Sequence, residues 1–287
     1  MNYVKIACLF ACLTLCINRA QAQPTVGFYG IQNHNTLVRV NPSNAATSVI
    51  GAMGVSGLDF STMAFNPNDS QLYAIGYEFA TDFYNFYQIS PTSGAVSAVS
   101  PLGKYLSVGA FEGLEYVPTL NSMVLTRWAP AFGSLSLTRD LYTITSTGAM
   151  TAMGVTTGTP DNDAATYDST RNTFYSLDSS PTGFLADVNL TTGAANLHAA
   201  VPAAVWDGAY SDTLDTIFAT SNGTSLWAIP ASNVNSSFSF VGNFTSGHVG
   251  AIAIVSATSA PEPGTLGLLA LGMIGGIATR KRKAQRV

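Results

Sequence analysis

Short runs of alternating apolar and polar residues recur along the chain between residues 26 and 255. One run reads Leu-Tyr-Thr-Ile-Thr-Ser-Thr-Gly at residues 141–148, and related runs occupy residues 37–44, 86–94, 185–193 and 226–230. Alternation with a period of two is typical of a half-buried β-strand, and the Pro, Ser, Thr and Gly residues that follow supply a turn. The next strand closes on a glycine in four units, at Gly51, Gly103, Gly154 and Gly242. The pattern therefore predicts a series of β-hairpins.

A second pattern alternates with the first and keeps a fixed spacing. An aromatic residue ends one strand and an apolar residue opens the next seven positions later, as in Phe65 and Leu72. The same pairing occurs at Tyr116 and Met123, Tyr167 and Phe174, and Tyr210 and Ile217. Each unit then holds four strands. Successive aromatics are 51, 51 and 43 residues apart, close to the period of ~40–50 residues that four-stranded propeller blades show.

Four complete units fit residues 57–104, 109–155, 163–200 and 206–243. Residues 26–51 resemble a unit that lacks its first strand, and residues 250–255 resemble that missing strand. Pairing the two ends would complete a fifth unit and remove exposed sheet edges. We therefore predict an all-β, five-bladed β-propeller within residues 24–256. The alternatives are a β-sandwich or a six-bladed ring with a degenerate blade near residues 79–85 or 128–137. The body shows no convincing helical period, which disfavours an α/β enzyme fold.

The first 22 residues have the organisation of a secretory signal peptide, which is expected to be helical. Lys5 precedes an apolar run at residues 6–17, and Ala20-Gln21-Ala22 provides small residues around a cleavage site after Ala22. The three cysteines of the chain all lie in this segment, at positions 8, 12 and 16. The processed protein is therefore expected to have no disulfide, no thiol nucleophile and no Cys-ligated metal.

Residues 257–287 form a second specialised segment. Pro261, Glu262 and Pro263 precede an uncharged run at residues 265–279, and the run is followed by Arg280, Lys281, Arg282 and Lys283. A helix of this length spans about 22 Å, somewhat less than a hydrocarbon core of ~30 Å. The basic residues would remain on the cytoplasmic side. We therefore predict a short transmembrane helix at about residues 265–279, with the body exported.

A Pro-Glu-Pro motif, an apolar helix rich in Gly and Leu and a terminal basic cluster together resemble the PEP-CTERM sorting signal of exported proteins in Gram-negative, often exopolysaccharide-producing, bacteria. The resemblance implies a temporary membrane anchor that an exosortase-type enzyme processes near Pro261, Glu262 and Pro263, while Arg280, Lys281, Arg282 and Lys283 act as the membrane-retention signal. It implies the membrane, the processing enzyme and an exopolysaccharide as partners, and the cell surface or extracellular matrix as destination. The repeated body is also similar to bacterial extracellular propeller families, including lactonase-like and quinoprotein-like ones, whose functions differ widely.

Charge is segregated along the chain. The formal net charge is −4, but residues 23–260 contain five basic and fifteen acidic residues, a charge of −10. Nucleic-acid binding needs clustered Lys and Arg, so this body is a poor candidate for it.

The repeat places five titratable residues shortly before the end of the first strand of each unit: Asp59, Glu112, Asp163, Asp207 and His248. If these strands are innermost, the five side chains would ring one mouth of the central channel. Such a ring could hold Ca²⁺ or a cationic ligand, or supply an acid–base pair. Alternatively, each side chain satisfies backbone N–H groups at a strand start.

Familiar catalytic motifs do not occur. The body has no nucleophile elbow, and its histidines, His34, His198 and His248, lack the spacing of a zinc site. We therefore expect a non-catalytic binding or structural body without a cofactor. The alternative is a secreted propeller hydrolase or lyase that acts on polysaccharide or lactone. Aromatic residues that could contact carbohydrate or simply pack crowd two hairpins: Tyr77, Phe79, Phe83, Tyr84, Phe86 and Tyr87 in one, Trp128 and Phe132 in the other.

Overall fold

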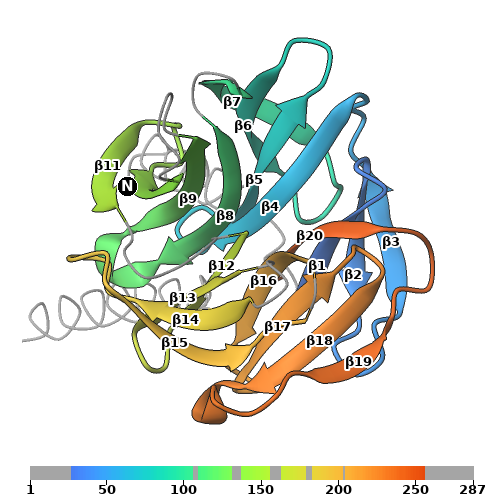
Figure 1. The fold of residues 1–287 in the computed structure, drawn as a ribbon. Helices are drawn as coiled ribbons and strands as arrows, with labels where there is room; N and C mark the ends of the chain where they lie inside the picture. The colour runs from blue at the N-terminus through green and yellow to red at the C-terminus, as the bar shows by residue number, and fades with distance from the viewer. Residues whose placement is uncertain are drawn as a thin grey trace, which may run out of the picture. The chain divides into compact units, whose positions relative to one another are not determined.

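The computed structural model describes residues 27–105, 109–130, 137–155, 163–178, 183–202 and 204–255. This part of the chain forms five antiparallel sheets of four strands each (Figure 1). In the described part, no helix has the length and apolar character needed to cross a bilayer. The predicted signal peptide, sorting motif and transmembrane segment all lie outside these residues.

Each sheet is one blade, and its strands follow one another from the inside of the ring outward. Blade 1 holds β4 (Leu58–Asn66), β5 (Gln71–Glu78), β6 (Phe83–Ile89) and β7 (Val96–Lys104). Blade 2 holds β8 (Ala110–Val117), β9 (Ser122–Pro130), β10 (Leu137–Ile144) and β11 (Met150–Val155), with the 3-10 helix η1 (Pro118–Leu120) between β8 and β9. Blade 3 holds β12 (Ala164–Asp168), β13 (Thr173–Leu177), β14 (Phe184–Val188) and β15 (Ala195–Ala200). Blade 4 holds β16 (Val205–Ser211), β17 (Thr216–Ser221), β18 (Ser225–Pro230) and β19 (Ser239–Asn243), with η2 (Ala231–Asn233) after β18.

Blade 5 is built from both ends of the body, as predicted. Its order is β20 (Val249–Val255), β1 (Gly27–Gln32), β2 (Thr36–Val40) and β3 (Thr47–Ala52). The pairing of β20 with β1 is antiparallel and runs from Gly27 opposite Val255 to Gln32 opposite Val249. The five-bladed propeller is thus confirmed. The β-sandwich and the six-bladed ring are wrong, and residues 79–85 belong to the β5–β6 hairpin of blade 1.

The first strands of the five blades, β4, β8, β12, β16 and β20, form the inner wall. Each packs against the next around a closed circle, and β20 returns to β4 (Figure 1). Because successive strands alternate in direction, the starts of the inner strands share one face with the turns between the second and third strands of every blade. We call this face the mouth. Since the ring closes within Gly27–Val255, the compact unit Pro24–Ser256 contains every strand pairing of the described fold.

The recurrent glycines have a specific cause. In each outer strand a β-bulge interrupts the pairing with the third strand, for example where Leu37 pairs with Gly51 and Val38 with Val49. The extra residue, Ile50, turns inward and packs on the core, as do Leu102, Met153 and Val241 in three other blades. A Cβ atom on Gly51 would overlap the carbonyl oxygen of Ser93 in the next blade. Bulges also twist exposed edges away from pairing with another chain.

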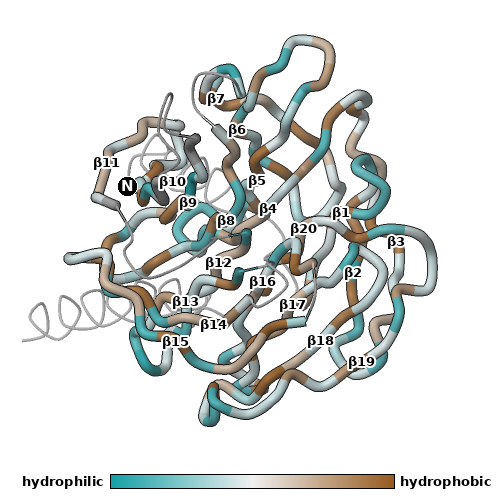
Figure 2. The backbone as a smooth tube through the Cα atoms, in the orientation of Figure 1, coloured by the Kyte–Doolittle hydropathy of each residue, from teal (hydrophilic) through white to brown (hydrophobic). Residues whose placement is uncertain are grey.

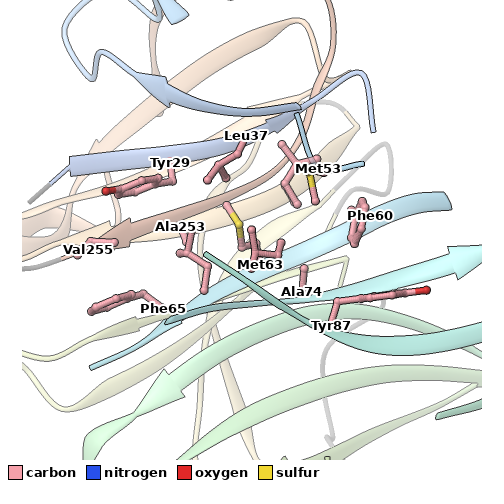
Figure 3. Close-up of a cluster of buried hydrophobic side chains, with 14 of the residues drawn as sticks. Tyr29, Leu37, Met53, Phe60, Met63, Phe65, Ala74, Tyr87, Ala253 and Val255 are labelled. Carbon is pink, nitrogen blue, oxygen red and sulfur yellow. The ribbon is translucent and has the colours of Figure 1, made fainter. Parts of the chain in front are cut away.

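The hydrophobic core is divided among the interfaces between neighbouring blades, and hydrophobic and hydrophilic positions alternate along the strands (Figure 2). Figure 3 shows the cluster in which side chains of blade 5, such as Tyr29 and Leu37, meet side chains of blade 1, such as Met63 and Phe65. Three of the aromatics crowded in this hairpin are buried in the core: Phe86 stacks on Tyr73, Tyr87 packs edge-on against Phe60 and Tyr84 packs edge-on against Phe111. Both faces of β6 pack against core clusters, so the consecutive residues Phe86 and Tyr87 are both buried.

Candidate functional site at the mouth

The five sequence-predicted site residues all stand at the mouth end of an inner strand. Asp59, Glu112 and Asp207 lie in β4, β8 and β16, while Asp163 and His248 directly precede β12 and β20. Among the residues that the structure describes, no group of three or more His, Cys, Asp or Glu side chains is arranged to hold a metal ion. Ca²⁺ binding by these five residues stays a prediction.

Two of the five residues are joined by a histidine that the repeat did not single out. His34 Nδ1 lies 2.8 Å from Asp59 Oδ1, and the two side chains are 40% and 39% exposed. The His34 ring lies 5.3 Å from the His248 ring, and the ring of Trp206 meets His248 edge-on at 4.4 Å. Trp206 is itself 40% exposed. We call His34, Asp59, Trp206 and His248 the histidine cluster; they come from blades 5, 1 and 4.

His34 occupies a backbone position that normally requires glycine. The β1–β2 turn has positive φ angles at Asn33 (48°) and His34 (60°), and the corresponding β17–β18 turn has them at Asn222 (51°) and Gly223 (61°). Both are type I′ turns, closed by hydrogen bonds from Asn35 N to Gln32 O and from Thr224 N to Ser221 O, and Asn-Gly is their preferred sequence.

An L-residue pays about 1–2 kcal/mol for this conformation, whereas a half-exposed ion pair contributes only about 0–1 kcal/mol. Pairing with Asp59 therefore does not stabilise the fold enough to explain why a histidine, and not a glycine, stands at this position. Backbone strain of this kind is a reason to look for a function.

His248 is held in place by both turns. Its backbone N–H donates to Asn33 Oδ1 at 3.0 Å, and its carbonyl accepts from Asn33 N at 2.7 Å. The imidazole lies against the backbone of Gly223, where a Cβ atom would overlap the ring. Burial, and then the neighbouring His34, lower the pKa of His248, which keeps it neutral at pH 7. Its Nδ1 atom is buried and has no hydrogen-bond partner in the described part of the chain.

A group of aromatic side chains from the β5–β6 hairpin lies next to Asp59 in blade 1. Tyr77 pairs directly with Asp59 across β4 and β5, and its ring lies 5.0 Å from Tyr84 and 5.2 Å from Phe79. Phe79 is 64% exposed at the hairpin tip. Burial, followed by the charge of Glu112, raises the pKa of Tyr84, so Glu112 faces this aromatic group. Phe83 lies beneath Lys104, and Phe132 is outside the described residues.

Asp207 has a different role from the other four. Its side chain is buried, and Oδ2 accepts hydrogen bonds from the backbone N–H groups of Met63 in β4 (3.2 Å) and Ile252 in β20 (2.8 Å). Oδ1 accepts from the Thr62 hydroxyl at 3.1 Å and from Gly208 N at 2.9 Å. The carboxylate thus joins blades 4, 5 and 1 across the centre of the ring. It satisfies backbone donors, as the alternative reading of the sequence expected.

A cavity of about 510 Å³ lies away from the mouth, between blades 2 and 3. Its lining includes Asn172 and Asn189, but both side chains already have partners. Asn189 accepts from the backbone N–H groups of Thr191 and Thr192, and Asn172 accepts from the Tyr167 hydroxyl. The mouth holds the histidine cluster, in which the buried Nδ1 atom of His248 has no hydrogen-bond partner among the described residues, so we place the candidate site there. Sequence reasoning missed His34 and Trp206; the signal for His34 was Asn-His at a turn where the next blade has Asn-Gly.

Comparison with known proteins identifies a sorting motif outside the propeller body. Residues 259–283 match the family model of the PEP-CTERM protein-sorting motif, which confirms the predicted sorting segment. The chain therefore combines an all-β propeller body with a motif that indicates export through membrane-anchored sorting. Curated proteins include no significant match to the chain.

A chain of a nidogen–laminin complex supports the fold alone. It is 10% identical to this chain with a TM-score of 0.56, and the match covers 81% of this chain and 99% of its own. A putative TolB from Agrobacterium tumefaciens is 12% identical with a TM-score of 0.49, covering 78% and 79%. A gluconolactonase from Xanthomonas campestris is 14% identical with a TM-score of 0.41, covering 70% of each chain.

Proposed function

We propose that the protein is exported by its N-terminal signal peptide, anchored by residues 265–279, and processed near Pro261, Glu262 and Pro263 by an exosortase-type enzyme of a Gram-negative bacterium. The released body then reaches the cell surface or extracellular matrix. There the mouth binds a carbohydrate chain, and exopolysaccharide is the proposed ligand. The sorting motif at residues 259–283 supports the export route.

The observation that carries the binding proposal is that His248 and Asp59, which His34 joins, each have an aromatic neighbour at the mouth. Trp206 packs against His248, and Tyr77, which contacts Phe79, pairs with Asp59 across β4 and β5. A pyranose ring has an apolar C–H face and a rim of hydroxyl groups. Aromatic faces suit the former, while carboxylate and imidazole groups suit the latter. The same site therefore offers both kinds of contact that a sugar ring needs.

The test uses the purified body, residues 24–256, in calorimetric titrations with oligosaccharides prepared from the producing organism's exopolysaccharide. Trp206→Ala should weaken binding by about tenfold, or about 1.4 kcal/mol, as expected for an aromatic anchor. Phe240→Ala is the matched control, because Phe240 is 53% exposed on outer strand β19 and packs only on Trp227 among aromatic rings of the described residues. Equal affinities for the two variants would argue against binding at the mouth.

The sorting proposal has a separate test. Deletion of residues 261–287 should abolish the membrane-bound precursor and send the body directly to the periplasm or medium. Replacement of Pro261, Glu262 and Pro263 by Ala should instead trap the precursor in the membrane fraction. If both variants fractionate like the unmodified protein, the anchor is not at this end of the chain.

A further inference from the structure

The His34–Asp59 pair of the histidine cluster has the arrangement of a general base and the group that orients it. A neutral imidazole that donates Nδ1–H to a carboxylate has its Nε2 lone pair free to accept a proton. His34 Nδ1 faces Asp59 Oδ1 at 2.8 Å, and the half-exposed ring remains open to water. We propose that His34 is a general base and Asp59 its positioning residue in the hydrolysis of ester groups, such as O-acetyl groups, on the carbohydrate at the mouth. The inference rests on the proposed binding function.

The surroundings of His34 suit this role. Its nearest aromatic neighbour, His248, is kept neutral by burial and by His34 itself, so it places no positive charge beside an imidazolium that forms during reaction. The charged groups at the starts of the next two inner strands, Glu112 and Asp163, are acidic, and negative charge favours that imidazolium. Lys104 is at the same face but on outer strand β7, where it lies over the Phe83 ring. Trp206, which packs on His248, and Tyr77, which pairs with Asp59 across two strands, are the aromatic side chains that would hold a sugar ring near the pair.

The reaction requires only water as co-reactant. His34 Nε2 removes a proton from water while the water oxygen forms a bond to the ester carbonyl carbon. The tetrahedral intermediate then breaks its bond to the sugar oxygen, and that oxygen takes the proton back from His34. The products are a carboxylic acid and a free sugar hydroxyl, and Asp59 stays ionised throughout. Cleavage of the glycosidic bond would instead need two carboxyl groups on opposite sides of the bond, whereas Asp59 is committed to the imidazole.

The test measures acetate release from acetylated xylan by the body, residues 24–256, with p-nitrophenyl acetate as a second substrate. His34→Gly restores the residue that the equivalent turn of blade 4 carries, so this variant should fold at least as well as the parent. It should lower kcat by about 10²-fold or more, the usual contribution of a general base. Asp59→Asn should also lower kcat and should change the pH profile, because the imidazole loses its charged partner.

His198→Ala is the matched control, since His198 Nε2 lies 3.5 Å from Asp187 on the outer part of blade 3, away from the mouth. Its activity should equal that of the parent. Any pH dependence of the rate that the His34 side chain contributes should be present in the parent and in this control, and should be absent from His34→Gly.

Binding of oligosaccharide without acetate release, or equal activity of the parent and His34→Gly, would overturn the catalytic inference while leaving the binding function intact. Absence of binding to any of these carbohydrates would instead remove the proposed function.

Discussion

Removal of the Asp207 carboxylate should destabilise the propeller more than any other single acidic substitution in the body. The two oxygens accept four hydrogen bonds, and three of the donors, Thr62, Met63 and Ile252, belong to other blades. Asp207→Ala would leave these donors buried without an acceptor. Each such group costs about 1–3 kcal/mol, so three unpaired donors should give a loss of about 3 kcal/mol or more.

Two further variants separate the causes of this loss. Asp207→Asn keeps the side-chain volume and one acceptor oxygen but turns an amide N–H₂ group toward donors, so it should cost about half as much as Asp207→Ala. Asp212→Ala removes an exposed carboxylate that accepts hydrogen bonds from the adjacent Thr213, and it should stay within about 0.5 kcal/mol of the parent.

The assay is urea unfolding of residues 24–256, monitored by tryptophan fluorescence. A pure stability change shifts the midpoint and leaves the slope unchanged. If Asp207→Asn unfolds at the parent's midpoint, the hydrogen bonds are not what Asp207 contributes. If Asp207→Ala also matches Asp212→Ala, the carboxylate does not join the blades in solution.

Three further predictions concern pH, a turn and ring closure. Burial raises the pKa of Glu115 to about 8. Between about pH 4.3 and 8 the folded protein therefore binds more protons than the unfolded chain, and it loses stability as pH rises through this window. Glu115→Gln should reduce the difference between the urea midpoints measured at about pH 5 and at about pH 8. Gly223→Ala should destabilise the protein by about 1 kcal/mol more than Gly54→Ala in the same assay. Both glycines have a positive φ angle, but only a Cβ atom at position 223 would overlap His248. Equal losses would show that the overlap is relieved. Deletion of residues 249–255 should abolish the cooperative thermal transition seen by circular dichroism, whereas ending the chain at residue 256 should preserve it, since only the first change removes β20.

The blade boundaries could be predicted from the sequence because their signals are local. Alternation marks each strand, and the seven-residue spacing from Phe65 to Leu72 and its equivalents fixes each first hairpin. The closure of blade 5 followed from the same repeat, since one unit lacked its first strand and the end of the body supplied one. The role of the glycines did not follow, because Gly51 is required by a carbonyl group of a neighbouring blade.

The site was harder to predict because it depends on contacts between blades. Asp59 and His248 were selected by their repeat position. The residue that connects them, His34, lies in the β1–β2 turn, which is not part of an inner strand, so the repeat position could not select it. Trp206 was missed because it stands beside Asp207 in β16 and carries no motif. Nothing in the alternation reveals which of two neighbouring side chains reaches the centre of the ring and which faces the mouth.

The centre of the ring shows why departures from the repeat are more informative than the repeat itself. Thr62 and Asp207 occupy equivalent positions, three residues before Phe65 and Tyr210, and the position is Gly113 in blade 2. A carboxylate at this position in every blade would bring like charges together in a buried space, and most of them would have to be protonated. One carboxylate and one hydroxyl instead satisfy each other and the backbone donors around them. The same reasoning applies at the mouth, where the equivalent turns carry Gly223 in one blade and His34 in the next. The common fold does not require a histidine at this turn, so what distinguishes the turn is the contact of the His34 side chain with Asp59.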